Sequence, residues 1–330
     1  MSDRYASAPD VSVHRLVLCL ACAAMVFVAA CGEAADSGAP AKGHTLTIGF
    51  SPMTMAAPAL QGLAHGVTAY GGSKGYAVKV ADPNGDPAKQ VQQLLGWIWR
   101  GEVDVVWTLP VSAGPMRQVL DEARKRKVPI LAVGEPKDFG YARPAAGVSF
   151  SGIDNTVYGR RLGALMADCV NRRLGGRAKV ILVVDPPGTS SAPKTVRDGF
   201  VAGLSAGAPG AKIVAEVDSH ADRLKAQQAT ASALQAHPDA DALAGFNNES
   251  TLGGLGALEQ AGRKPASLCV AGSGADDEAK AAVKSGKLYG EIEIEFERDL
   301  RESVDLLAKM AADPTAAGIN KPTPIAEYRG

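Results

Sequence analysis

The sequence has no excess of charge of either sign. Lysine and arginine together number 35, and aspartate and glutamate also number 35, so the formal net charge at pH 7 is zero. A surface that binds a polyanion needs an excess of basic residues, so no nucleic acid partner is expected. Aromatic residues are scarce at 5%, whereas 37 glycines and 20 prolines can punctuate many short elements. With 46% hydrophobic and 21% charged residues, the composition predicts a globular chain and excludes wholesale disorder.

The motifs that hold nucleotides or activate nucleophiles are missing. No Gly-x-Gly-x-x-Gly follows the first apolar run, where Phe50 leads into Ser-Pro-Met-Thr-Met, and neither a Walker-type loop nor a Gly-x-Ser-x-Gly turn occurs. The histidines of the expected folded body have no nucleophile pattern nearby; they are His44, His65, His220 and His237. We therefore expect no catalytic residue, no cofactor and no metal, and hence no enzyme.

The amino terminus is built like an export signal. Residues 16–30 form an apolar run after His14 and Arg15 that is short for a membrane span. The run ends in Val-Ala-Ala-Cys, which resembles a bacterial lipobox, so we expect a signal peptide over 1–30, lipidation of Cys31 and a flexible tether over 31–43. A plain signal peptide or an uncleaved anchor is the alternative. Because the stretch before His14 is long and carries acidic residues, we also hypothesise a start codon nearer Val11 or Val13.

Few cysteines remain for the folded body. Cys19 and Cys22 fall in the expected signal peptide and Cys31 is the expected lipid site, which leaves Cys169 and Cys269. No cysteine or histidine spacing in the folded body suggests a metal site. We expect two separately buried thiols, with a disulfide between them as the alternative that an exported protein permits.

Short apolar runs alternate with longer segments of helical periodicity from residue 45 onward. Such runs suit buried parallel strands, and the intervening helices then cover both faces of a sheet. Two successive series predict an α/β protein with two doubly wound, Rossmann-like lobes. The first series has expected strands at 46–50, 77–81, 103–107, 130–133 and 147–150, and helices at 58–71, 87–100 and 112–126. The second has strands at 179–184, 212–217, 242–246, 267–271 and 289–294, and helices at 153–174, 192–206, 221–235, 250–262, 276–285 and 297–312.

Several short motifs occur along the chain between residues 82 and 253. They are residues 82–90 (DPNGDPAKQ), 153–159 (IDNTVYG), 187–190 (PGTS), 197–200 (RDGF), 236–242 (AHPDADA) and 247–253 (NNESTLG). Their order and spacing resemble the ribose-type (type I) periplasmic substrate-binding proteins of ABC importers. The resemblance covers residues 45–328, and an export signal stands where a related repressor would carry a DNA-binding headpiece.

The resemblance implies a hinge-bending receptor without catalysis. Two lobes joined by three crossings close around a solute and present the closed form to a membrane permease. The implied crossings fall near residues 152–154, 294–296 and 321–323. They divide the chain into an N-terminal lobe of residues 44–152 plus 295–321 and a C-terminal lobe of 153–294 plus 322–330. A monomer is expected, held by lipid at the extracytoplasmic face of the cell membrane.

The resemblance also implies ligand contacts, but the chain keeps only part of the family's sugar-binding set. Asn247 matches a ligand-contacting Asn, and Lys194 falls near a ligand-contacting Arg. Replacing Asn247 by alanine is expected to weaken binding and leave the stability of the unliganded protein nearly unchanged. The departures are residues 57–60 (APAL) in place of an aromatic pair, Gly134 and Glu135 in place of an Asp-Arg pair, Gly274 in place of an Asp, and Ile294 in place of a hinge Gln.

Other side chains at the ends of the expected strands are candidates to replace the missing groups. Trp107 closes the third strand, and its alternative is an ordinary core or rim tryptophan. Phe139 and Tyr141 follow the fourth strand, with loop packing as their alternative. Glu135 is a further polar candidate for ligand binding. Met55 and Ile294 are the apolar candidates.

The acidic run at residues 291–297 alternates carboxylates with apolar side chains. Alternation places the two kinds on opposite faces of a strand. A solvated sheet edge is the simplest interpretation, and a cationic solute such as an amine in place of a sugar is the sharper one.

Two alternative functions of the whole protein stay open: a receptor that reports ligand to a chemoreceptor or histidine kinase, and an exported enzyme on the same scaffold.

Overall fold

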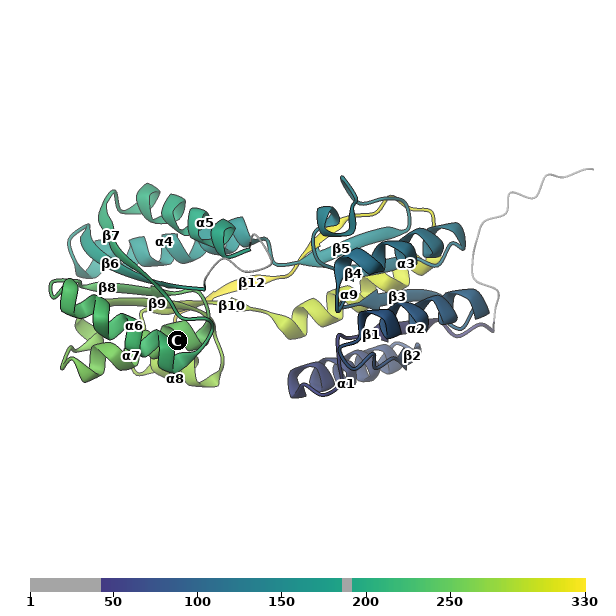
Figure 1. Ribbon diagram of the computed structural model, residues 1–330, viewed down its shortest axis with the longest axis horizontal. Coiled ribbons are helices and arrows are strands. Elements are labelled where there is room, and N and C mark those ends of the chain that lie inside the picture. Colours follow the sequence, from purple (N-terminus) through teal and green to yellow (C-terminus); the bar gives the residue numbers. More distant parts are fainter. Residues whose placement is uncertain (1–42, 186–191) are drawn as a thin grey trace, which may run out of the picture. The chain divides into compact units, whose positions relative to one another are not determined.

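A computed structural model describes residues 43–185 and 192–330 (Figure 1). Strands and helices alternate along this part of the chain and build two separate sheets, so the predicted α/β fold with two doubly wound lobes is confirmed. The expected signal peptide, the lipid site Cys31, nearly all of the tether and the motif at 187–190 lie outside the described residues.

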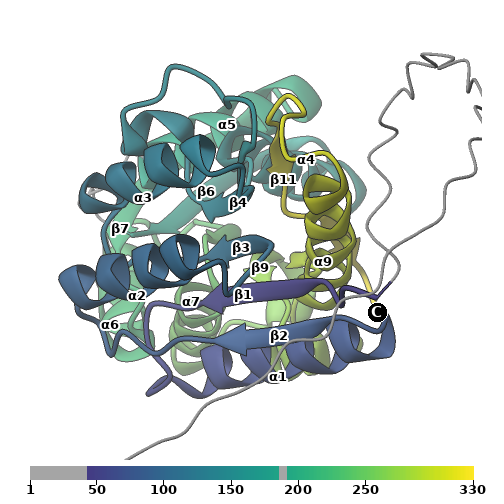
Figure 2. The same cartoon turned by 90° about the vertical axis from the view of Figure 1, so that its right-hand side faces the viewer.

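The first sheet has the order β11-β5-β4-β3-β1-β2, with parallel pairing throughout. Helices cover both of its faces (Figure 2): α1 and α9 enclose one hydrophobic cluster, and α2 and α3 enclose another. The strands are β1 (Thr47–Ser51), β2 (Ala77–Val80), β3 (Val105–Thr108), β4 (Ile130–Val133), β5 (Val148–Gly152) and β11 (Asn320–Pro322). The helices are α1 (Pro58–Ser73), α2 (Pro87–Arg100), α3 (Ala113–Lys125), η1 (Pro136–Phe139) and α9 (Phe296–Ala312).

The second sheet has the order β12-β10-β9-β8-β6-β7, and only β12 runs antiparallel to its neighbour among the described strands. Helices α4 and α5 pack on one face, and α6, α7 and α8 on the other. The strands are β6 (Arg177–Val184), β7 (Gly210–Asp218), β8 (Ala242–Gly245), β9 (Cys269–Gly274), β10 (Gly290–Ile294) and β12 (Ile325–Tyr328). The helices are α4 (Asn155–Arg173), α5 (Ala192–Gly207), α6 (Arg223–Ala236), α7 (Asn248–Gln260), η2 (Pro265–Ser267) and α8 (Asp277–Lys284).

Short polar side chains define where several helices begin. An N-cap oxygen satisfies backbone N–H groups that have no partner within the helix. Asp86 accepts from the backbone of Ala88 and Lys89 at the start of α2, and Asp154 accepts from Val157 at the start of α4. The same arrangement recurs at α6, α7 and α8, whose caps are Asp222, Asn247 and Asp276.

The described chain passes between the two sheets three times. It does so between β5 and α4, between β10 and α9, and between β11 and β12. Backbone bonds join these segments: Thr323 N donates to Gly152 O at 2.8 Å, and Glu295 N donates to Pro324 O at 2.9 Å. The strands β11 and β12 were not among the expected elements, because the sequence indicated only a crossing near residues 321–323.

Helices α4 and α5 pack through glycine. A Cβ on Gly163 would lie 2.1 Å from the carbonyl oxygen of Phe200, and one on Gly203 would lie 2.2 Å from that of Arg160. The two backbones therefore touch directly, while Leu162, Met166 and Leu204 fill the cluster beside them.

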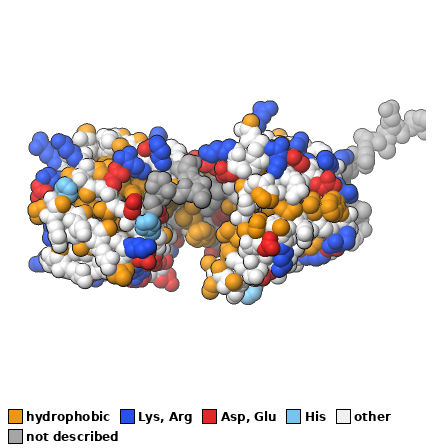
Figure 3. Space-filling model, in the orientation of Figure 1, with side chains coloured by type: hydrophobic (Ala, Val, Ile, Leu, Met, Phe, Trp, Pro, Cys, Tyr) orange, Lys and Arg blue, Asp and Glu red, His pale blue; other side chains and the backbone are white. Residues whose placement is uncertain are grey.

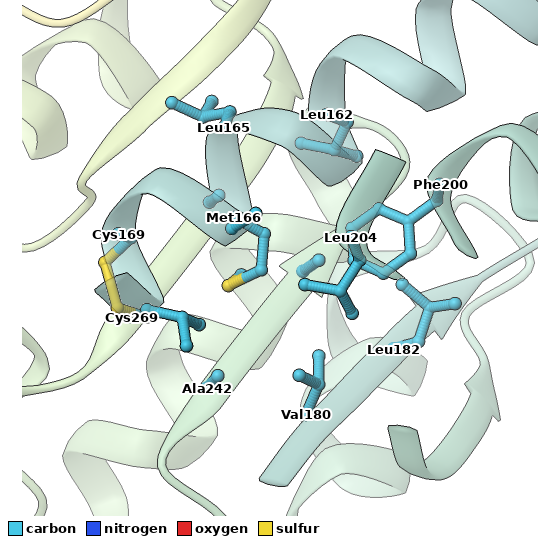
Figure 4. Packing of buried hydrophobic residues seen from close by; sticks show 14 of the residues in the cluster. Leu162, Leu165, Met166, Cys169, Val180, Leu182, Phe200, Leu204, Ala242 and Cys269 are labelled. Carbon is cyan, nitrogen blue, oxygen red and sulfur yellow. A yellow bond between two sulfur atoms is a disulfide. The ribbon is translucent and has the colours of Figure 1, made fainter. Parts of the chain in front are cut away.

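The expectation of two separate thiols is wrong. Cys169 on α4 and Cys269 at the start of β9 form a disulfide, with Cα atoms 5.7 Å apart (Figure 4). Both residues are fully buried in the cluster that α4 makes with the second sheet. The packing of this helix over this strand brings together two cysteines separated by 100 positions, a proximity that sequence spacing does not reveal.

Candidate functional site

The carboxyl ends of the parallel strands carry polar side chains in both sheets. Ligands of doubly wound proteins bind at this edge, because the loops that follow the strands gather there. The two edges, and the residues that fix their loops, therefore form the candidate site.

In the first sheet the edge is organised by Gln90 on α2, which is fully buried. Its Nε2 donates to Ser51 Oγ at 3.1 Å and to the carbonyl oxygen of Leu109 at 3.0 Å, and its Oε1 accepts from Val111 N at 2.8 Å. One amide thus ties together the loops that follow β1 and β3. Sequence reasoning missed this role, although Gln90 closes the motif at 82–90.

Asp82 fixes the neighbouring loop. Its Oδ1 accepts from Met55 N at 3.0 Å and from Asn84 N at 2.8 Å. Asn84 needs this support because its φ of 55° is in the left-handed region. Met55, a sequence candidate, therefore lies at the edge, half-buried against the α1 and α9 cluster.

Three aromatic candidates belong to the core, and the prediction that they line a cleft is corrected. Trp107 is 2% exposed and packs edge-on to Phe50, with ring centroids 5.3 Å apart. Phe139 and Tyr141 are 1% and 8% exposed and pack against Phe150. Their rings face other side chains of the first lobe, so they have no free face to offer a solute.

Glu135 is exposed at the carboxyl end of β4. It pairs with Lys137, with Nζ and Oε2 2.7 Å apart, and its backbone N–H donates to Asp138. Tyr141 lies nearby, but its hydroxyl donates to Asp121 at 2.6 Å inside the lobe. Of the candidates after β4, only Glu135 presents a polar group to solvent.

In the second sheet the edge is organised by Asp185, which follows β6. Its carboxylate accepts from Asn247 Nδ2, Ser219 Oγ and Ala221 N, each at 2.8 Å. Asn247 also caps α7, because its Oδ1 accepts from Ser250 N at 2.8 Å. The predicted site residue Asn247 is therefore at the edge, and Asp185 and Ser219 are the partners that sequence reasoning missed.

Asn248 occupies the space that a side chain at Gly274 would fill. A Cβ on Gly274 would lie 2.4 Å from Asn248 Oδ1, and Gly274 itself has a φ of 120° that favours glycine. The oxygen is buried and has no hydrogen-bond partner among the described residues. The sequence showed the loss of a side chain at Gly274 but not its replacement by an amide from α7.

The two remaining candidates lie at the ends of elements. Lys194 is exposed in the first turn of α5 and pairs with Asp198 one turn later. Ile294 ends β10 and packs, half-buried, against the cluster under α4.

The acidic strand is not a solvated edge, and that interpretation is corrected. β10 lies between β9 and β12, so Glu291 is fully buried, and burial raises its pKa to about 7. Glu293 pairs with Lys280 at 2.5 Å and Glu295 with Arg298 at 3.2 Å. The predicted alternation is present, because Ile292 packs into the hydrophobic cluster under α4, on the other face of the sheet.

Over residues 43–185 and 192–330, no three acidic, histidine or cysteine side chains gather in a way that could hold a metal ion. Nor does any helix in these two ranges combine the length and apolar character that a membrane crossing requires. Basic and acidic side chains are interspersed over the visible face of the molecule (Figure 3), as the balanced composition leads one to expect.

A family model for the periplasmic binding protein domain matches residues 48–312. The chain belongs to the periplasmic binding protein family. This match spans both sheets and most of the described elements, and the resemblance found in the sequence motifs is thereby confirmed.

Curated members of the periplasmic binding protein family resemble the chain over most of its length. The ribose import binding protein of Haemophilus influenzae is 29% identical over 261 residues, which are 79% of this chain and 83% of that protein. The ribose import binding protein of Bacillus subtilis is 26% identical and covers 82% of each chain. A xylitol-binding protein of Mycolicibacterium smegmatis is 26% identical over 79% of this chain and 70% of its own length.

Solved structures share the fold of this periplasmic binding protein. A periplasmic ribose ABC transporter protein from Conexibacter woesei has a TM-score of 0.72 at 20% identity and covers 86% of this chain and 91% of its own. An ABC transporter solute-binding protein from Mycobacterium smegmatis with bound glycerol has a TM-score of 0.65 at 25% identity, with coverage of 87% and 94%.

Proposed function

We propose that the chain is the extracytoplasmic solute-binding protein of an ABC importer and that it captures a sugar or a sugar-like polyol by hinge closure. The lobes of the proposed receptor are residues 44–152 plus 295–321 and residues 153–294 plus 322–330. Its partners are the solute and a membrane permease. Catalysis has no part in this function.

The observation that carries the proposal is the threefold passage of the chain between two sheets, in a protein whose relatives are named as import binding proteins. Short paired crossings let two rigid lobes rotate about a few residues. The solute stabilises the closed form because only that form offers contacts from both lobes.

The chemistry of the carboxyl edges supports a neutral, hydroxyl-rich solute. A buried hydroxyl group loses water and needs donors and acceptors in exchange. The amides of Asn247 and Asn248 lie at the edge of the second sheet, and Asn248 Oδ1 has no partner among the described residues. Glu135, the exposed acidic candidate of the first edge, is already paired with Lys137, which favours a sugar over a cation.

A ligand screen tests the proposal. Small molecules released from the purified protein are identified by mass spectrometry, and D-ribose, D-allose, D-arabinose, xylitol and glycerol are then compared by thermal shift. A ligand at about a hundred times its Kd stabilises the folded form by about 2.7 kcal/mol. Failure of every sugar and polyol to raise the melting temperature, with an amine succeeding instead, would overturn the choice of solute.

The proposal includes a lipid anchor at Cys31. In cells, the wild-type protein is expected in the membrane fraction, and Cys31→Ser is expected to leave it, because acyl chains supply the attachment. Cys22→Ser is the matched control and should not change the distribution. Equal membrane attachment of the Cys31→Ser protein would refute the anchor and leave solute binding untouched.

A further inference from the structure

Glu291 is a buried carboxyl group that no side chain of the described residues hydrogen-bonds. It lies in β10, with β9 and β12 on either side, and its exposed fraction is 0%. Neither carboxyl oxygen makes a hydrogen bond of normal geometry to any described residue, although the backbone amide of Ala275 is close enough to oppose the rise of its pKa. An ionised carboxylate in such a place is costly, because little replaces the water that solvated it.

The sequence makes room for this side chain. A Cβ on Gly272, the neighbour of Glu291 in β9, would lie 2.6 Å from Glu291 Oε1 and 2.5 Å from Thr251 Oγ1. Glu291 and Thr251 therefore share the space that a side chain at position 272 would fill. The carboxyl group is held against the first turns of α7.

The hydrogen-bonding state of Thr251 makes the charge of Glu291 important. Thr251 Oγ1 donates its only hydrogen to the carbonyl oxygen of Asn247, at 2.8 Å. What remains on this hydroxyl group is two lone pairs, which repel an ionised carboxylate in the shared space beside Gly272 more strongly than a neutral carboxyl group. Asn247 in turn caps α7 and bonds to Asp185. The charge of Glu291 therefore affects the first turn of α7, which holds Asn247 at the carboxyl edge of the second sheet.

The surrounding charges do not neutralise Glu291. Burial is the main cause that raises its pKa, Asp276 adds to the effect, and the Ala275 amide and Lys280 offset part of it. Lys280 is committed to Glu293 at 2.5 Å and faces the ring of Tyr328 at 5.4 Å. The titratable groups that face Glu291 are Asp276 and Lys280 from the α8 region, Glu293 from β10, Tyr328 from β12 and Tyr158 from α4. The contacting residues of β9 and α7, Gly272 and Thr251, do not titrate.

We propose that Glu291 is a positioning residue that must carry a proton for the first turn of α7 to keep its place at the carboxyl edge of the second sheet. A displaced α7 would also move Asn247 and so weaken solute binding; that consequence rests on the proposed function. The effect of Glu291 on α7 itself does not. Because the folded-state pKa lies above the ordinary value of a glutamate, stability is full in acid. It falls as pH rises from the ordinary value to about 7, and is level above that.

Denaturant unfolding of the full chain at about pH 5.5 and about pH 8 tests the proposal through linkage. The folding equilibrium constant of the wild-type protein should fall between these pH values by roughly tenfold to a hundredfold more than that of Glu291→Gln. Glu297→Gln is the matched control, since its exposed carboxylate pairs with Arg301 on α9 and does not act on Glu291; it should keep the wild-type pH dependence. Equal pH dependence in Glu291→Gln and the wild type would overturn the proposal.

Hydrogen exchange distinguishes a positioning role for Glu291 from a purely structural one. After correction for intrinsic rates, amides of residues 248–255 should lose about tenfold or more of their protection in the wild type at the higher pH and keep it in Glu291→Gln. Protection of this segment that does not change with pH would refute the positioning role. If Glu291→Gln fails to fold, isotope-edited infrared spectroscopy of the wild type decides. A protonated glutamate band present at the lower pH and lost at the higher one supports the proposal, and its absence at both overturns it.

Discussion

Asn247 uses its side-chain amide twice within its own lobe. The oxygen caps α7 through Ser250 N, and the nitrogen donates to Asp185. One further N–H and one further lone pair remain for a ligand. The side chain can therefore serve the fold and a solute together.

Replacing Asn247 by alanine should lower the free energy of unfolding of the unliganded protein by about 1–2 kcal/mol, because both bonds are lost. This revises the expectation from sequence that stability would hardly change. Asn247→Ser is the control that retains a capping oxygen, and it should lose about half as much. Denaturant titration of the three proteins checks this; unchanged stability in the alanine variant would contradict the cap.

The buried amide of Gln90 offers a second test at the same scale. Gln90→Met should lower the free energy of unfolding by about 1–3 kcal/mol, since the Val111 N–H and the Leu109 carbonyl lose their partner. Gln93→Met, one turn later on α2, loses a single bond to the backbone of Asp82 and should cost clearly less. Equal losses in the two variants would show that Gln90 does not organise the edge.

Site residues could be predicted only in part. The motif at 247–253 places Asn247 correctly at the edge. Position at a strand end does not say which way a ring points, and so Trp107, Phe139 and Tyr141 were assigned to a cleft although they fill the core. Asp185, Gln90 and Asn248 were missed because their importance lies in partners distant in the sequence.

At the scale of elements, the contact of α4 with α5 depends on residues without side chains. Gly163→Ala should lower the free energy of unfolding by about 2 kcal/mol or more, because the new methyl group would overlap the Phe200 carbonyl and force the helices apart. Gly62→Ala is the matched control: it lies inside α1, where an added Cβ meets nothing within 4 Å, and should stabilise by about 0.5–1 kcal/mol. A tolerated alanine at position 163 would contradict the direct backbone contact.

Helices were easier to predict than the last strands. The helix expected at 87–100 coincides with α2 because residues next to its ends define them. These are the cap Asp86, the proline at the first helical position and the left-handed Gly101. β11 and β12 are only three and four residues long, and each exists through a partner far away, β5 for the one and β10 for the other. Nothing local marks such strands.

At the scale of the whole molecule, the disulfide closes a long loop. Joining Cys169 to Cys269 restricts the unfolded chain across 100 residues, so its reduction should lower the free energy of unfolding by about 2–5 kcal/mol. Unfolding with and without reductant measures this loss. A Cys169→Ala and Cys269→Ala double variant should be insensitive to reductant, and a wild type that is equally insensitive would argue against the bond.

The order of synthesis has a consequence for how this molecule matures. The ribosome delivers β11, which completes the first sheet, and α9, which covers it, only after nearly all of the second sheet has emerged. Strand β12 comes last of all. A nascent chain therefore cannot finish either half early, and the amino-terminal half must wait with an exposed strand edge at β5 until the final residues arrive. Such a delay is what the proposed extracytoplasmic function calls for, because an exported polypeptide has to stay unfolded until translocation is complete.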